Sequence, residues 1–261
     1  MFKKYFIAIV GNESLNHIYI AALVTICIIF SECVIANSLQ DAIDDNDLAK
    51  VKKLISKKVD LNQNDSDGNP LLYYTLVNRK LKIAELLLKK GANPNTKNKY
   101  GAPILITAAG SGYKNIVRLL IKKGADVNAS FERYDNVTAL MLAAQEGDSE
   151  VVDILIRNGA NVNAVTSSGD TALIAASAKG DLNSVKSLLK NGAKINAQSD
   201  AGYTALFVAV SENNLELVKY LINKKADVDI KDTNGDTVYK LAERSKSTDI
   251  VKVLNRARNV K

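Results

Sequence analysis

The chain has 261 residues and a formal net charge of +7, and hydrophobic residues make up 47% of it. It has only three prolines and no stretch rich in serine and glycine, so its composition excludes a flexible linker and a low-complexity region. Both cysteines and the single histidine lie within residues 1–36. The chain beyond residue 36 therefore lacks the side chains for a disulfide, a thiolate or imidazole metal site, or a cysteine or histidine mechanism.

Residues 1–36 are predicted to be a signal peptide or a signal anchor. A pair of lysines near the N-terminus precedes an apolar run from Ile18 to Phe30, which is shorter than the about 20 residues that cross a membrane. Val34 and Ala36 have the small-residue spacing of a signal-peptidase site. Cleavage after Ala36 would leave a mature chain that starts where the first repeat begins.

The alternative is an uncleaved leader that anchors the protein in a membrane through residues 18–35. A second apolar patch, from Phe6 to Val10, favours this interpretation because it lengthens the leader. In both cases the repeats are expected to be exported, since lysines lie before the apolar run and acidic residues follow it. The expected location is the periplasm or the exterior of the cell.

The chain beyond the leader repeats itself. Leucine, and finally tyrosine, recurs at intervals of 33 residues with one interval of 35: Leu39, Leu72, Leu105, Leu140, Leu173, Leu206 and Tyr239. A fixed period of this length predicts stacked supersecondary units around one continuous core. We therefore predict one elongated domain over residues 37–261, because each unit of such a stack contacts only its neighbours.

Each unit is predicted to hold two helices, and the clearest unit runs from Ser168 to Ala197. Thr171 can cap a first helix, which Gly180 ends. Apolar residues between Val185 and Leu189 recur at helical spacing on a second helix. Gly192 is predicted to close this helix in the left-handed conformation, and an extended turn leads to the next unit.

A further motif, Gly-Ala-Asn/Asp followed two residues later by Asn, recurs at Gly91–Asn95, Gly124–Asn128 and Gly159–Asn163. Together with Thr-Ala-Leu and a pair of alanines, it resembles the ankyrin repeat from about Ser38 to the C-terminus. The resemblance implies an all-α solenoid of about seven helix-turn-helix units with projecting β-hairpin loops, capped by the first and last units. It also implies a non-catalytic protein–protein interaction module or adaptor that binds a partner protein through its concave face and hairpin tips.

The chain departs from the family at the histidine of the usual Pro-Leu-His motif. That position holds Gln40, Tyr73, Ile106, Met141, Ile174, Phe207 and Lys240. The hydrogen bonds that this histidine makes in the family are absent, so we expect apolar packing to replace them. No enzyme activity, cofactor or metal is expected, since no motif for a phosphate loop or a shaped catalytic pocket is visible.

The lysines recur with the fold. Several lie where the second helix of a unit ends, at Lys89, Lys122, Lys190 and Lys224, and there they complement the negative end of the helix dipole. We favour this role over a phosphate-binding stripe, which would also need interleaved aromatic or arginine side chains. A weak binder of nucleic acid or of anionic surfaces remains an alternative to the interaction module.

The resemblance places partner contacts on the hairpin tips and on the inner helix surface after the alanine pair. The 35-residue interval adds two residues to the loop from Ala129 to Asn136 and puts Phe131, Arg133 and Tyr134 on one hairpin. Aromatic and arginine side chains are enriched at interface hot spots, although Phe131 could instead fold back onto its own hairpin. The predicted partner-binding residues are Tyr100, Phe131, Arg133, Tyr134, Gln145, Glu146, Lys179, Tyr203 and Glu212.

Overall fold

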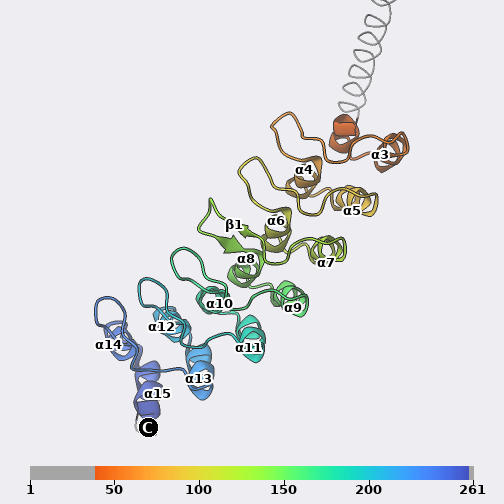
Figure 1. Cartoon of the computed structure of the whole chain (residues 1–261). Helices are drawn as coiled ribbons and strands as arrows, with labels where there is room; N and C mark the ends of the chain where they lie inside the picture. The colour runs from red at the N-terminus through yellow and green to blue at the C-terminus, as the bar shows by residue number, and fades with distance from the viewer. Residues whose placement is uncertain (1–38, 259–261) are drawn as a thin grey trace, which may run out of the picture.

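The computed structural model describes residues 39–258, which form an elongated stack of helices with hairpin loops along one side (Figure 1). This arrangement confirms the predicted all-α solenoid. The predicted signal peptide or signal anchor, residues 1–36, lies outside the described residues. Among the helices within residues 39–258, none has the length and apolar character needed to cross a membrane.

The helices lie in two rows, and the first row is next to the hairpin loops (Figure 1). Residues 39–44 form the helical segment at the N-terminal end of the described chain. The first row continues with α4 (Leu71–Val77), α6 (Ile104–Gly110), α8 (Ala139–Glu146), α10 (Ala172–Lys179), α12 (Ala205–Ser211) and α14 (Val238–Arg244).

The second row lies behind the first (Figure 1). It contains α3 (Leu48–Ile55), α5 (Leu81–Lys89), α7 (Lys114–Lys122), α9 (Ser149–Arg157), α11 (Leu182–Lys190), α13 (Leu215–Asn223) and α15 (Thr248–Arg258). From α4 onward, each first-row helix packs against the second-row helix that follows it in the chain and against its neighbours in its own row. Within the described residues, the main contacts between units are therefore made between adjacent units, as expected for a solenoid.

Threonine caps begin the central first-row helices, as the Thr-Ala-Leu motif predicts. The hydroxyl of Thr171, which caps α10, accepts a hydrogen bond from the backbone N–H of Ile174 at 3.2 Å. Thr138 caps α8 and Thr204 caps α12 in the same way. Proline replaces threonine before α4 and α6, where its fixed φ suits the start of a helix. The first-row helices therefore begin at matching positions, which aligns them in the stack.

In most units a glycine in the left-handed conformation follows the second-row helix, as predicted for Gly192, where φ is 89°. Lys225 occupies the corresponding position after α13 and adopts a φ of 67°. This conformation is unfavourable for a side chain with a Cβ atom, so the unit that ends at Lys225 holds a strained residue. The predicted lysines at helix ends are also found: Lys89, Lys122 and Lys190 lie in the last turns of their helices.

The repeated leucines form the centre of the core. Each of the six, from Leu39 to Leu206, is no more than 2% exposed, and Tyr239 in the last unit is half-buried. The positions that lack the family histidine are also filled by apolar packing in the middle of the stack, where Ile106, Met141 and Phe207 are buried. The predicted replacement of that histidine by apolar contacts is thus confirmed in the central units.

Candidate functional site

The hairpin between α7 and α8 is longer than the other hairpins of the described chain. Its strands β1 (Ser130–Phe131) and β2 (Val137–Thr138) pair antiparallel, with Ser130 opposite Thr138. Four of the other hairpins close with a single bridge between residues six positions apart: Asn64 with Pro70, Lys97 with Pro103, Val165 with Thr171, and Lys231 with Thr237. The two extra residues predicted from the sequence therefore lie in this loop.

Two left-handed residues shape the tip of the lengthened hairpin. Asp135 and Asn136 both have a φ of 56°, and the N–H of Val137 donates to the carbonyl of Tyr134 at 3.1 Å. A tight turn with positive φ at both central residues favours Asp and Asn, whose short side chains tolerate this conformation. The local sequence thus explains why the chain reverses directly after Tyr134.

The two aromatic residues of this hairpin face different ways. Phe131 is half-buried against the core and stacks on Tyr134 with 5.9 Å between ring centroids, whereas the Tyr134 side chain is 64% exposed. The role of Phe131, Arg133 and Tyr134 in partner binding stays a prediction. Phe131 itself folds back onto its own hairpin, which is the alternative that the sequence left open. The physical reason is that Phe131 lies on a paired strand next to buried core residues. Tyr134 follows on the solvent side of the turn.

Hydrogen bonds tie the tip to the next hairpin. The Ser168 hydroxyl donates to the carboxylate of Asp135 at 2.8 Å, and the backbone N–H of Ser167 donates to the carbonyl of Asp135 at 3.0 Å. The side-chain amide of Asn136 also donates to the Ser167 hydroxyl at 2.9 Å. These contacts fix Tyr134 and Asp135 relative to α10, so the surface between the two hairpins is formed before any partner binds.

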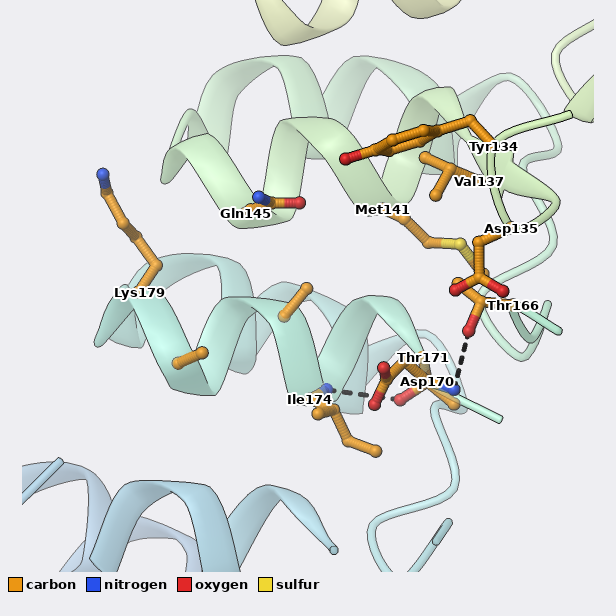
Figure 2. Close-up of a pocket in the computed structure, with 12 residues that line it drawn as sticks. Tyr134, Asp135, Val137, Met141, Gln145, Thr166, Asp170, Thr171, Ile174 and Lys179 are labelled. Carbon is orange, nitrogen blue, oxygen red and sulfur yellow. Dashed lines mark hydrogen bonds between the residues drawn. The ribbon is translucent and has the colours of Figure 1, made fainter. Parts of the chain in front are cut away.

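A groove of about 710 Å³ lies between α8 and α10, below these hairpins. Figure 2 shows Tyr134, Val137, Met141 and Gln145 on the α8 side, and Asp170, Ile174 and Lys179 on the α10 side. The full lining is Tyr134, Asp135, Val137, Met141, Gln145, Thr166, Asp170, Thr171, Ile174, Ala175, Ala178 and Lys179. Its floor is apolar and its polar residues gather at the two ends. We call this feature the α8/α10 groove.

The hairpin end of the α8/α10 groove is acidic. Burial raises the pKa of the Asp170 carboxyl above its ordinary value, and the negative charges of Asp135 and Asp200 raise it further. At the other end of α10, the exposed side chain of Lys179 carries the opposite charge. The groove is therefore polarised along its length, with an unfavourable concentration of negative charge near the hairpins.

Three of the nine predicted contact residues line this groove, namely Tyr134, Gln145 and Lys179. The other six do not line it. Tyr100 is 55% exposed beneath Lys99 in the preceding hairpin, and Tyr203 is 39% exposed and stacks on Phe207. Arg133, Glu146 and Glu212 are exposed.

Sequence reasoning placed Asp170 on a hairpin tip but missed the groove residues Met141, Ile174 and Ala178 as candidates for binding. A signal for two of them was available, because Ile174 and Ala178 are spaced four residues apart within α10 and therefore share one face of that helix. The contribution of Met141 needed the structure, since α8 and α10 belong to different units. Residues 39–258 contain no group of three or more His, Cys, Asp or Glu side chains placed to hold a metal ion.

The fold and the groove define a class of protein: a helical repeat solenoid that presents a pre-formed surface beside projecting hairpins. The family model for ankyrin repeats matches in three copies, at residues 39–131, 129–199 and 197–260. The chain therefore belongs to the ankyrin-repeat family, whose arrays are generally protein–protein interaction modules and typically non-catalytic. Comparison with curated proteins gives no match.

Proposed function

We propose that this protein is an exported, non-catalytic adaptor that binds a partner protein through its hairpin tips and the inner surface of its first-row helices. The observation that carries the proposal is the α8/α10 groove, which has an apolar floor, a mostly exposed tyrosine and charged ends. Concave surfaces of this kind, with a few convergent polar groups, are the usual form of a binding site. In this proposal the groove is a surface between two neighbouring units in an array of about seven repeats.

Photo-crosslinking tests where the partner binds. We would replace Gln145 or Lys179, which are exposed and line the groove, by the photoreactive residue p-benzoylphenylalanine and irradiate the protein in a lysate of its native host. Matched positions on second-row helices are Lys82 and Glu216, which are exposed. We expect a discrete crosslinked protein from the groove positions alone. Crosslinks of equal yield from Lys82 and Glu216 would contradict the proposed surface.

Export is supported by the sequence of residues 1–36, with lysines before the apolar run and a small-residue cleavage motif after it. We propose cleavage after Ala36, which gives a periplasmic or secreted protein. The alternative is an ankyrin scaffold anchored by residues 18–35. Mass spectrometry of the protein isolated from its native host separates the two, because a mass that includes residues 1–36 is expected only for the anchored scaffold.

One observation favours weak binding of an anionic surface as a second candidate function. A hollow of about 860 Å³ between α13 and α15 is lined by three basic residues, Lys219, Lys225 and Arg256, against one acidic residue, Asp227, and otherwise by Asn196 and apolar side chains. Contacts of this kind depend strongly on salt, so they weaken at physiological ionic strength. Retention of DNA binding by the full chain at about 150 mM salt would support this candidate. Loss of DNA binding at this salt concentration would leave the adaptor as the proposed function.

A further inference from the structure

The last hairpin of the stack holds Asp236, which can be compared with Asp170 of the α8/α10 groove. Asp170 and Asp236 hold the same position in their units, since each directly precedes the N-cap threonine of a first-row helix, Thr171 or Thr237. Each also accepts, through its backbone carbonyl, a hydrogen bond from a residue four positions earlier at 2.9 Å. The two carboxylates therefore project from equivalent backbone positions.

Their charged surroundings are opposite. Lys240 and Arg244 form ion pairs with the carboxylate of Asp236 and lower its pKa. The equivalent positions on α10 are Ile174 and Ala178, which carry no charge. Asp170 consequently forms no ion pair within residues 39–258, although Asp135 lines the same end of the groove and adds a second negative charge.

Asp135 does not relieve this charge. Its carboxylate accepts a hydrogen bond from the neutral Ser168 hydroxyl, and within the described residues it forms no ion pair with a lysine or arginine. Two carboxylates at the end of a partly enclosed apolar groove repel each other and lose hydration. A cation brought by a partner would remove both unfavourable contributions, as Lys240 and Arg244 do for Asp236.

The space where that cation would lie is open. Ala178, at the position of Arg244, is small, and Ile174, at the position of Lys240, is 7% exposed and forms part of the groove floor. A long side chain can place its methylene groups on this floor while its charged end reaches the carboxylates. Tyr134 stands at the same end with 64% of its surface exposed, and tyrosine rings favour a cation over their face.

We propose that the α8/α10 groove binds an extended segment of the partner protein through an arginine side chain, which inserts between Asp135, Asp170 and Tyr134. Arginine fits better than lysine because its planar guanidinium can bond two carboxylates at once and can stack on an aromatic ring. The inference rests on the proposed function, and it names the chemistry that the partner must present. The protein has a net charge of +7 and as a whole repels cationic ligands, so binding of an arginine peptide would indicate a local acidic site.

The test uses the purified full chain and a phage library of random short peptides. We expect selected peptides to share an arginine, and replacement of that arginine by neutral citrulline to lower affinity about ten-fold. Asp170→Asn should weaken binding of the same peptides about ten-fold, whereas Glu216→Gln should leave it unchanged. Glu216 is an exposed acidic residue on the second-row helix α13, away from the hairpins, and it is the matched control.

A second pair of variants separates charge from shape. Ala178→Arg recreates the cation that Arg244 supplies to Asp236, so it should block binding of arginine peptides. Ala178→Met introduces a long side chain without a charge, so it should block their binding much less. Selection of peptides without arginine, no enrichment at all, or equal effects of the two Ala178 variants would overturn the inference. Crosslinking at Gln145 or Lys179 in a lysate leaves Asp135, Asp170 and Tyr134 unchanged and does not depend on peptide chemistry, so it shows separately whether the proposed function fails.

Discussion

Asp170 illustrates how a single residue can be suited to a partner at a cost to the free protein. Its carboxyl is half-buried near Asp135 and Asp200, and its pKa is raised. The folded state therefore binds protons more strongly at this site than the unfolded state does. It follows from proton linkage that this site makes the folded protein less stable as the pH rises through the interval between the ordinary pKa of an aspartate, about 3.9, and the raised value.

Asp170→Asn should therefore raise the thermal midpoint of the full chain at neutral pH. The gain should shrink as the pH falls through that interval, because the wild-type carboxyl then becomes neutral as well. Differential scanning calorimetry of both proteins from neutral to acidic pH measures the difference. A lower midpoint for the variant at neutral pH would show that the Asp170 charge stabilises the fold, contrary to the burial and repulsion described for it.

Lys225 is a second residue at which a substitution is expected to change stability, here because of its backbone conformation. It adopts a φ of 67° where most units have glycine, so Lys225→Gly should relieve strain. The greater freedom of glycine in the unfolded chain opposes this gain, but the relief of strain is larger. We therefore expect a net stabilisation of about 0.5–1 kcal/mol in urea unfolding. Its neighbour Lys224 has a φ of −84°, and Lys224→Gly should instead destabilise the protein. Stabilisation by both variants would contradict the argument.

At the scale of elements, the units are joined by asparagine side chains as well as by apolar packing. The asparagine that ends each Gly-Ala-x-x-Asn motif, and Asn62 at the same position of the first unit, accept a hydrogen bond from a backbone N–H of the following unit at 2.7–2.9 Å. Three of them also donate to the carbonyl of the glycine in that unit. The series consists of Asn62, Asn95, Asn128, Asn163 and Asn196.

Asn128→Ala should remove two of these hydrogen bonds, to the N–H of Asn161 and the carbonyl of Gly159. Because each net hydrogen bond contributes about 0.5–1.5 kcal/mol, we expect a loss of about 1–3 kcal/mol in the free energy of unfolding. Asn223→Ala, on the exposed surface of α13, is the control and should change stability by less than about 0.5 kcal/mol. Equal losses for both variants in urea titrations would show that the asparagine series does not join the units.

The sequence predicted these elements better than it predicted their side-chain arrangement. The spacing from Leu39 to Tyr239 places the buried face of each first-row helix, and the 35-residue interval places the extra hairpin residues. Local signals could not predict that Phe131 turns inward while Tyr134 turns outward, because both are aromatic residues of one loop. Nor could they predict the groove, since its walls come from units about 33 residues apart and meet only when α8 packs on α10.

At the scale of the whole molecule, stability depends on the position of a unit in the stack. Leu140 lies in a central unit and is 2% exposed, whereas Tyr239 belongs to the last first-row helix and is only half-buried. A central residue supports neighbours on both sides, and a terminal one supports a neighbour on one side. Local unfolding should therefore begin at the ends of the array.

Leu140→Ala should accordingly lower the free energy of unfolding by about 2–5 kcal/mol, the usual cost of emptying a leucine site in a core. Tyr239→Ala should cost less, although it removes the hydrogen bond from the tyrosine hydroxyl to the carbonyl of Leu254. Chemical denaturation measured by circular dichroism compares the two. Coinciding midpoints would count against a stack in which units depend on their neighbours.

Hydrogen exchange of the full chain with and without its crosslinked partner tests the central claim most directly. If the partner binds the hairpins and the α8/α10 groove, amides in residues 130–138 and in α8 and α10 should exchange more slowly in the complex. Amides of α9 and α11, in the second row behind them, should change little. Protection confined to α9 and α11, with unchanged exchange at the lengthened hairpin, would contradict the proposed binding surface.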